Sequence, residues 1–182
     1  ASGARVVRYS SSLRWAVKRW VDFVYDGGDV ALETDARSIR DSLKIVSSEG
    51  NRLFNGFVRL SRDYKTKAEL LSLVISRYPK DDPFHATAMT TLSKLQGEYF
   101  SFVASASRAT PGAFISRYIR SAQLPMVDGT APPDKQLEFL KAHALDSVDF
   151  ADADLVRSDL FSLKSIEYLT YYRNPQIPKE LL

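Results

Sequence analysis

The chain has 182 residues, of which 45% are hydrophobic and 26% are charged, and this composition argues against a wholly disordered protein. Its 25 basic and 22 acidic side chains leave a net charge of only +3, so charge alone indicates no nucleic-acid partner. It contains no cysteine, which excludes disulfide bonds, thiolate nucleophiles and most structural zinc sites.

Residues 1–35 predict a small β-element. Valine and aromatic residues form three strand-like runs, at residues 6–9, 20–25 and 30–34. The sequence Asp26-Gly27-Gly28-Asp29 predicts a tight hairpin between the last two runs, since glycine readily takes the positive φ that such turns need. Residues 10–19 fit either a strand or a helix, because their apolar positions could share one helical face. Three strands make an incomplete sheet, so we expect the end of a β-domain here.

From about residue 49, hydrophobic residues recur at the alternating steps of three and four that are typical of an amphipathic helix. This long helix is predicted to end before Pro79, and Asp82-Pro83 predicts the cap and first position of the next helix. The two apolar stripes predict an antiparallel hairpin with a short turn. The inward positions are Leu53, Phe57, Leu60, Tyr64, Leu71, Val74 and Tyr78, then Phe84, Ala88, Leu92, Leu95, Tyr99, Phe102 and Ala106.

Three shorter helices are predicted after this hairpin. Thr110-Pro111 repeats the cap-plus-proline signal for a helix to about Ala122, and Asp134 is predicted to cap another after a proline-rich loop. A final helix, ending before Pro175, is predicted to carry Leu160, Leu163, Ile166 and Leu169. The predicted fold class is therefore mainly α: a helical bundle of about five helices (residues 36–182) with a small N-terminal β-strand element (residues 1–35).

Three stretches carry a resemblance to a known family: residues 33–54, with Ser48-Glu49-Gly50-Asn51 at a helix start, residues 111–125 and residues 143–157. The last is the most specific, through His143, Asp146, Val148, Asp149, Phe150, Asp152, Leu155, Val156 and Arg157. In order, the stretches resemble the helical domain, with the end of a small β-domain, that precedes the thioredoxin-like domain in bacterial envelope thiol–disulfide oxidoreductases.

The resemblance implies a context and not a reaction. The family's Cys-x-x-Cys pair supplies the attacking and resolving thiols, and it would follow Leu182. The chain is therefore expected to be a non-catalytic accessory or interaction domain, with no catalytic, cofactor-binding or metal-binding residue. The implied partner is a thioredoxin-like domain, in the same or a partner chain. The implied location is the periplasmic side of the cell envelope, with any lipid anchor outside this chain. Because the chain begins with Ala1, we expect a processed or trimmed segment.

The residues alone predict that segment 143–157 is a rigid connector between helices. Its aspartates, Asp146, Asp149, Asp152 and Asp154, are short acceptors that bond nearby backbone N–H groups in turns and caps. Val148 and Phe150 are expected to point inward, and Arg157 to pair with one of the carboxylates. The alternative is a calcium site, although the glycine and the closing glutamate of an EF-hand loop are missing.

The first 21 residues contain five basic residues, Arg5, Arg8, Arg14, Lys18 and Arg19, and no acidic one. Interleaved with Tyr9, Trp15 and Trp20, they form a candidate basic surface. The alternative function is therefore a helical binding module for an anionic ligand, a nucleic acid or a lipid surface. Alternating charges are equally typical of the solvated face of a strand. His85 and His143 are predicted to be packing or surface residues. No Gly-x-Ser-x-Gly, His-Glu-x-x-His or P-loop motif indicates an enzyme.

Overall fold

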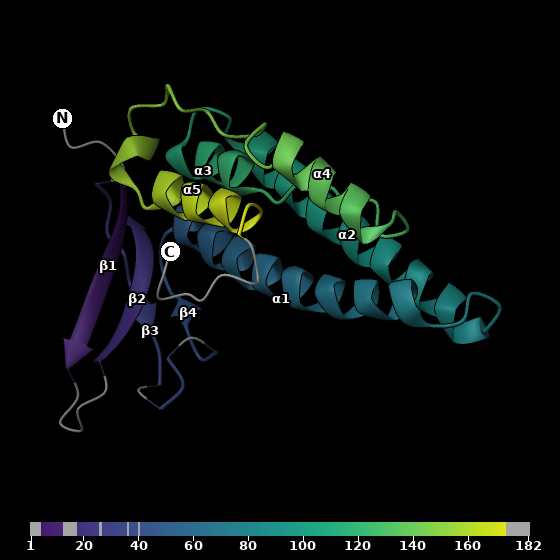
Figure 1. The fold of residues 1–182 in the computed structure, drawn as a ribbon. Coiled ribbons are helices and arrows are strands. Elements are labelled where there is room, and N and C mark those ends of the chain that lie inside the picture. The colour runs from purple at the N-terminus through teal and green to yellow at the C-terminus, as the bar shows by residue number, and fades with distance from the viewer. Residues whose placement is uncertain (1–4, 13–17, 26, 36, 40, 174–182) are drawn as a thin grey trace.

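A computed structural model describes residues 5–12, 18–25, 27–35, 37–39 and 41–173, with only the backbone described up to residue 20. Five α-helices and one short 3₁₀ helix make up most of this part of the chain, and the strands gather at one end of the helical layers (Figure 1). The predicted mainly α class with a small N-terminal strand element is confirmed.

The strands form two separate antiparallel pairs in the described ranges. β1 (Arg5–Ser12) pairs with β2 (Lys18–Tyr25), and β3 (Leu32–Glu33) pairs with β4 (Lys44–Ile45). The predicted hairpin between the second and third runs is therefore wrong. Gly27 does take a positive φ of 97°, but the chain then leaves the β1–β2 sheet, and β3 finds its partner in β4. This pairing joins residues on both sides of position 35, and the predicted domain boundary there stays a prediction.

The long helix α1 (Glu49–Arg77) begins and ends where its sequence predicts. Ser48 caps it by accepting a hydrogen bond from the Asn51 N–H at 3.3 Å, and Ser48 takes a φ of 87°, which is uncommon for a residue with a side chain. At the other end Tyr78 is extended, the conformation that the following Pro79 favours.

A buried asparagine joins α1 to the β1–β2 hairpin. Asn51 is 1% exposed, and its Oδ1 accepts a hydrogen bond from the Val24 N–H at 2.7 Å. Its Nδ2 donates to the Val24 carbonyl oxygen at 2.8 Å, so the side chain pairs with β2 as the backbone of a neighbouring strand would. The same Nδ2 contacts Ser48 Oγ at 2.9 Å. One residue therefore serves both the helix start and the contact with the strand.

Helix α2 (Pro83–Ala109) lies antiparallel along α1, as predicted (Figure 1). Its cap Asp82 accepts a hydrogen bond from the Phe84 N–H at 2.8 Å. Where the two helices pack, the rings of Tyr64 and Tyr99 stack with their centroids 4.6 Å apart. Tyr99 is fully buried, and its hydroxyl accepts a hydrogen bond from the Leu124 N–H at 3.0 Å.

The tip of the hairpin has a small core of its own, formed by Ile75, Ala88 and Leu92. His85 is buried beside it, with Nε2 3.2 Å from the Ile75 carbonyl oxygen, which agrees with the predicted packing role. The inward placement predicted for Tyr78 and Phe84 is wrong. Their rings contact each other edge to face at 5.3 Å and stay exposed, because the neighbouring helix has already ended there.

The remaining elements are α3 (Phe114–Ala122), α4 (Pro133–His143), the 3₁₀ helix η1 (Leu155–Arg157) and α5 (Leu160–Thr170). The start predicted for α3 at Thr110-Pro111 is wrong. Thr110 is the C-cap of α2, and its carbonyl oxygen accepts a hydrogen bond from the Ala113 N–H in a turn that precedes the helix. Asp134 is not the cap of α4 either, since it lies in the first turn after Pro132 and Pro133.

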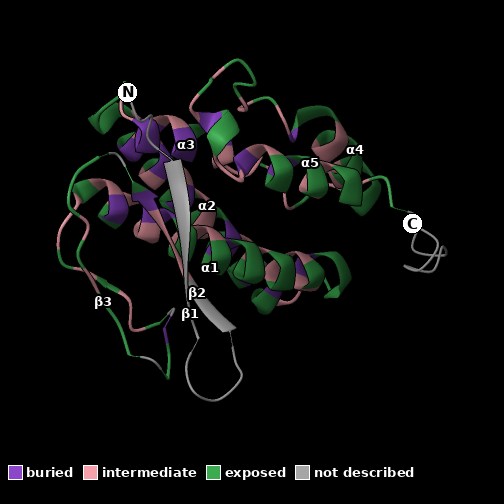
Figure 2. Ribbon diagram, turned by 90° about the vertical axis from the view of Figure 1, so that its left-hand side faces the viewer, coloured by how far each residue is buried: buried purple, intermediate pink, exposed green. Residues whose placement is uncertain are grey.

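The main core lies where α1, α2 and α3 converge (Figure 2). Its buried members are Val24, Phe54, Phe57, Tyr64, Tyr99, Val103, Ala106, Phe114, Ile115, Tyr118, Ile119, Leu155 and Leu160. Helix α4 contributes no buried residue and lies on the surface of the molecule. Among the described residues, no helix combines the length and the apolar composition needed to cross a bilayer.

Candidate functional site

Segment 143–157 connects α4 to α5, and its aspartate side chains form hydrogen bonds and ion pairs with other groups of the protein. The His143 ring nitrogen Nδ1 lies 2.7 Å from Asp146 Oδ2. Asp149 Oδ1 accepts a hydrogen bond from the Ala151 N–H at 3.0 Å, and Asp152 Oδ1 accepts one from the Asp154 N–H at 3.0 Å. These are the turn and cap contacts expected of a rigid connector. In the described ranges, no group of three or more metal-binding side chains is arranged to hold an ion.

An arginine of α3 holds the connector. Arg117 Nε lies 2.6 Å from Asp152 Oδ2, and Arg117 Nη2 lies 2.6 Å from Asp154 Oδ2. A third guanidinium nitrogen donates to the Gly112 carbonyl oxygen. The side chain of Asp152 is only 10% exposed, so this ion pair is shielded from water better than a surface pair. One planar guanidinium thereby fixes two carboxylates of the connector to α3.

The ion pair shifts the pKa of the Asp152 carboxyl group. Burial acts to raise the pKa of this carboxyl, but hydrogen bonds from Arg117 and from two backbone N–H groups outweigh burial, so the pKa falls below its ordinary value. The hydrogen bond to Asp152 is also the main reason that the pKa of Arg117 is raised. Asp152 is therefore ionised in the folded protein at every pH near neutrality.

Two residues of the connector do not lie where the sequence predicts. Arg157 is exposed and forms no ion pair with any described residue, whereas Arg117 binds the carboxylates of Asp152 and Asp154. Phe150 is 53% exposed, and its ring rests on Phe161 with the centroids 5.1 Å apart. Leu155 belongs to the main core and has no exposed surface, and Ala144 is buried as well. Arg117 is not among the residues that the sequence points to. Its one distinguishing feature is that this cation lies between Ser116 and Tyr118, which are both buried in the structure.

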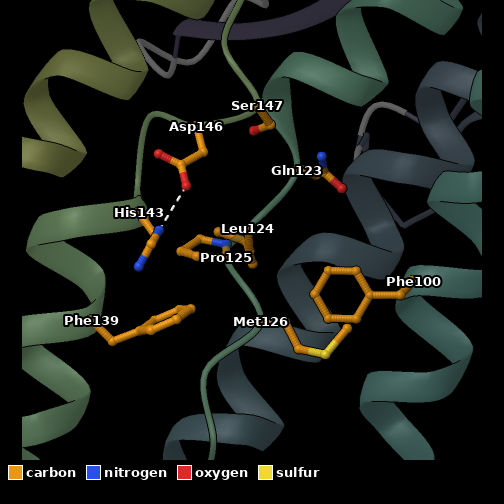
Figure 3. Close-up of a pocket in the computed structure, with 9 residues that line it drawn as sticks. All are labelled: Phe100, Gln123, Leu124, Pro125, Met126, Phe139, His143, Asp146 and Ser147. Carbon is orange, nitrogen blue, oxygen red and sulfur yellow. Dashed lines mark hydrogen bonds and ion pairs between the residues drawn. The ribbon is translucent and has the colours of Figure 1, made fainter.

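A pocket of about 220 Å³ lies beside His143 (Figure 3). Phe100, Met126 and Phe139 supply apolar walls, and the Phe139 ring lies 4.5 Å from the His143 ring. The Asp146 carboxylate contacts Nδ1 of the His143 ring. Ser147 lies on the Asp146 side of the pocket, away from the other ring nitrogen of His143 (Figure 3). The three side chains therefore do not form the serine–histidine–aspartate relay, in which the hydroxyl must face the second nitrogen.

Helix α5 exposes three of the four apolar residues that the sequence places on it. Leu160 is buried, but Leu163, Ile166 and Leu169 are 53%, 61% and 64% exposed. The side that faces the core carries Lys164, which is 4% exposed. We call Leu163, Ile166 and Leu169, which lie on one side of α5, the apolar stripe.

Polar contacts of the inward side fix this rotation. Lys164 Nζ donates to the Gln123 carbonyl oxygen at 2.7 Å and lies 3.4 Å from Glu167 Oε2. Glu167 also lies 3.7 Å from Lys65 Nζ on α1. Burial lowers the pKa of Lys164, although Glu167 opposes this shift. A buried ammonium group that has found a carbonyl and a carboxylate partner cannot turn outward without losing both, so the apolar stripe stays on the outside.

The basic residues of the N-terminal hairpin are placed only by their backbone. Arg8 lies opposite Asp22 and Arg19 lies opposite Ser11, while Arg5 and Lys18 are at the ends of the paired strands. Arg14 lies outside the described residues. The candidate basic surface therefore stays a prediction.

Comparison with protein-family models, with curated proteins and with solved structures gives no match for this chain.

Proposed function

We propose that this chain is a non-catalytic accessory domain that positions a thioredoxin-like domain, or the substrate of that domain, through the apolar stripe of α5. The exposed stripe is the observation that carries this proposal. An amphipathic helix ordinarily turns its apolar side to the core, and contiguous exposed apolar surface is typical of an interaction site. Here Lys164, through its hydrogen bond to the Gln123 carbonyl, supports the outward placement.

The nature of the partner comes from the sequence. Segment 143–157 carries the most specific resemblance to the envelope thiol–disulfide oxidoreductases, and it leads directly into α5. In that family a thioredoxin-like domain follows the helical domain, which makes it the natural occupant of the stripe. With no cysteine in this chain, the thiol chemistry would belong to the partner. The proposed location is the periplasmic side of the cell envelope.

The first test is the coding sequence beside this segment. The proposal requires a Cys-x-x-Cys domain in the same reading frame or in an adjacent gene. The two domains would then be produced together, and deuterium exchange of the α5 amides would be compared with and without the partner. We expect protection across the stripe, because docking would cover aliphatic side chains that are now more than half exposed.

A pair of variants separates docking from general surface effects. Ile166→Asp places a charge in the stripe, and Leu70→Asp places one on α1 at a leucine that is 62% exposed. We expect Ile166→Asp to weaken the complex at least about tenfold, and Leu70→Asp to leave it unchanged. Equal affinities for the two variants, or a coding region without a Cys-x-x-Cys domain, would refute the proposal.

A further inference from the structure

A second hollow, unrelated to the apolar stripe, lies where three parts of the chain meet. These are β2, helix α1 and the segment that follows β3. Its volume is about 280 Å³. The apolar lining comes from all three elements, and the polar lining comes mainly from α1. The lining residues are Val21, Ile39, Leu43, Phe54 and Val58 on the apolar side, and Asp22, Asn55, Arg59 and Arg62 on the polar side. Two cations and one carboxylate therefore line the hollow, which leaves an excess of positive charge.

The apolar floor is part of the folded structure. Phe54 is 6% exposed and belongs to the main core, and Ile39 is 8% exposed although it lies in a segment without regular secondary structure. Ile39 is held by its own backbone, because its carbonyl oxygen accepts a hydrogen bond from Thr34 Oγ1 at 2.8 Å. Ser42 Oγ closes the same turn by accepting from the Asp35 N–H at 2.8 Å and donating to the Ser38 carbonyl at 2.7 Å. Such a wall is preorganised for a ligand.

The cationic rim follows from helical spacing. Asn55, Arg59 and Arg62 are four and three residues apart on α1, which places them on one face of the helix. Arg59 is exposed and forms no hydrogen bond or ion pair with any described residue. Arg62 has only long contacts, at 3.5 Å to Asp63 and 3.9 Å to Asp41, and all three side chains are more than half exposed. Ion pairs of this kind contribute little and exchange readily with another anion.

We propose that this hollow binds a small monocarboxylic acid, with its alkyl chain on the apolar floor and its carboxylate between Arg59 and Arg62. Two guanidinium groups are well matched to a carboxylate, since each offers a fork of donors. The Asn55 amide adds a neutral donor on the same face. This proposal does not depend on the accessory role.

Hexanoate is a suitable probe for this site, and hexanamide is its uncharged counterpart. Both would be titrated into the ¹⁵N-labelled chain and followed by two-dimensional NMR. We expect hexanoate to shift the amide signals of the lining residues, and hexanamide to bind at least about tenfold more weakly, because it cannot form the charge-assisted hydrogen bonds.

Separate variants test the role of the arginines and the role of the apolar floor. Arg59→Gln with Arg62→Gln should weaken hexanoate at least about tenfold, whereas Arg77→Gln, an exposed arginine near the end of α1, should leave binding unchanged. Val58→Phe should fill the hollow, and Asp41→Asn should tighten binding by releasing Arg62. An unchanged spectrum with hexanoate, equal binding of the amide, or an unaffected double variant would each overturn the proposal.

Discussion

The contact between Asn51 and Val24 should be one of the most costly polar contacts to remove. Asn51→Ala leaves the N–H and the carbonyl oxygen of Val24 without their partners, and Val24 is only 2% exposed. Each unsatisfied buried backbone group costs about 1–3 kcal/mol, so the expected loss in the free energy of unfolding for the two groups is about 2–6 kcal/mol. With a slope of about 2 kcal/mol per molar urea, the unfolding midpoint should fall by about 1–3 M.

The measurement is urea unfolding followed by the circular dichroism of the helices, with Asn55→Ala as the matched control one turn further along α1. Asn55 is half-buried and has no hydrogen-bond partner among the described residues, so its replacement should shift the midpoint little. A loss below about 0.5 kcal/mol for Asn51→Ala would show that water replaces the side chain and that our reading of the contact is wrong.

Asn51→Asp gives the same contact a pH dependence. A protonated carboxyl can accept from the Val24 N–H and donate to the Val24 carbonyl oxygen, whereas the carboxylate can only accept. Burial would raise the pKa of this introduced carboxyl above its unfolded value of about 3.9. A raised folded pKa means that stability is present at low pH and is lost as the pH rises through that pKa. The variant should therefore approach the wild-type midpoint near pH 4 and fall well below it at pH 7.5; a constant difference would contradict this reasoning.

The remaining predictions concern other parts of the molecule. Arg117→Met should cost about 1–3 kcal/mol, since it leaves the shielded Asp152 carboxylate unpaired, and urea unfolding would measure this loss. Because the folded pKa of Asp152 is lowered, its contribution is present above its unfolded pKa and lost as the pH falls through the folded pKa, so the wild-type and Arg117→Met midpoints should converge in acid. Ser48→Ala should cost about 1 kcal/mol, whereas Ser48→Gly, which relieves the positive φ, should cost only a few tenths. Gly97→Ala, at an exposed position of α2 with open space for a methyl group, should raise the thermal midpoint through a gain of about 0.5–1 kcal/mol.

Local signals were sufficient to predict the long hairpin. The bounds of α1 and α2 follow from continuous apolar stripes, the Asp82 cap and the conformational limits of Pro79 and Pro83, all of which act within a few residues. The sequence predicts too early a start for α3 because Thr110-Pro111 has the chemistry of a helix start, while in the structure Thr110 ends α2.

Contacts between distant residues could not be predicted in this way. The sequence contains many arginines, and only the packing of α3 against the connector selects Arg117 over Arg157 for Asp152 and Asp154. The rotation of α5 was equally hidden, because apolar residues occur on more than one side of this short helix. Burying Leu160 together with Lys164 is decided by the position of the Gln123 carbonyl oxygen, which belongs to another element.

The small core of Ile75, Ala88 and Leu92 gives the far end of the hairpin a stability separate from that of the main core. That end lies away from the β-strands, so fluctuations there disturb few other elements (Figure 1). We expect α1 and α2 to separate transiently, starting from the turn at Pro79. Amide exchange should then be faster toward the tip of the hairpin and slower toward Tyr64 and Tyr99. The main core would then stay rigid while the far end of the hairpin opens and closes.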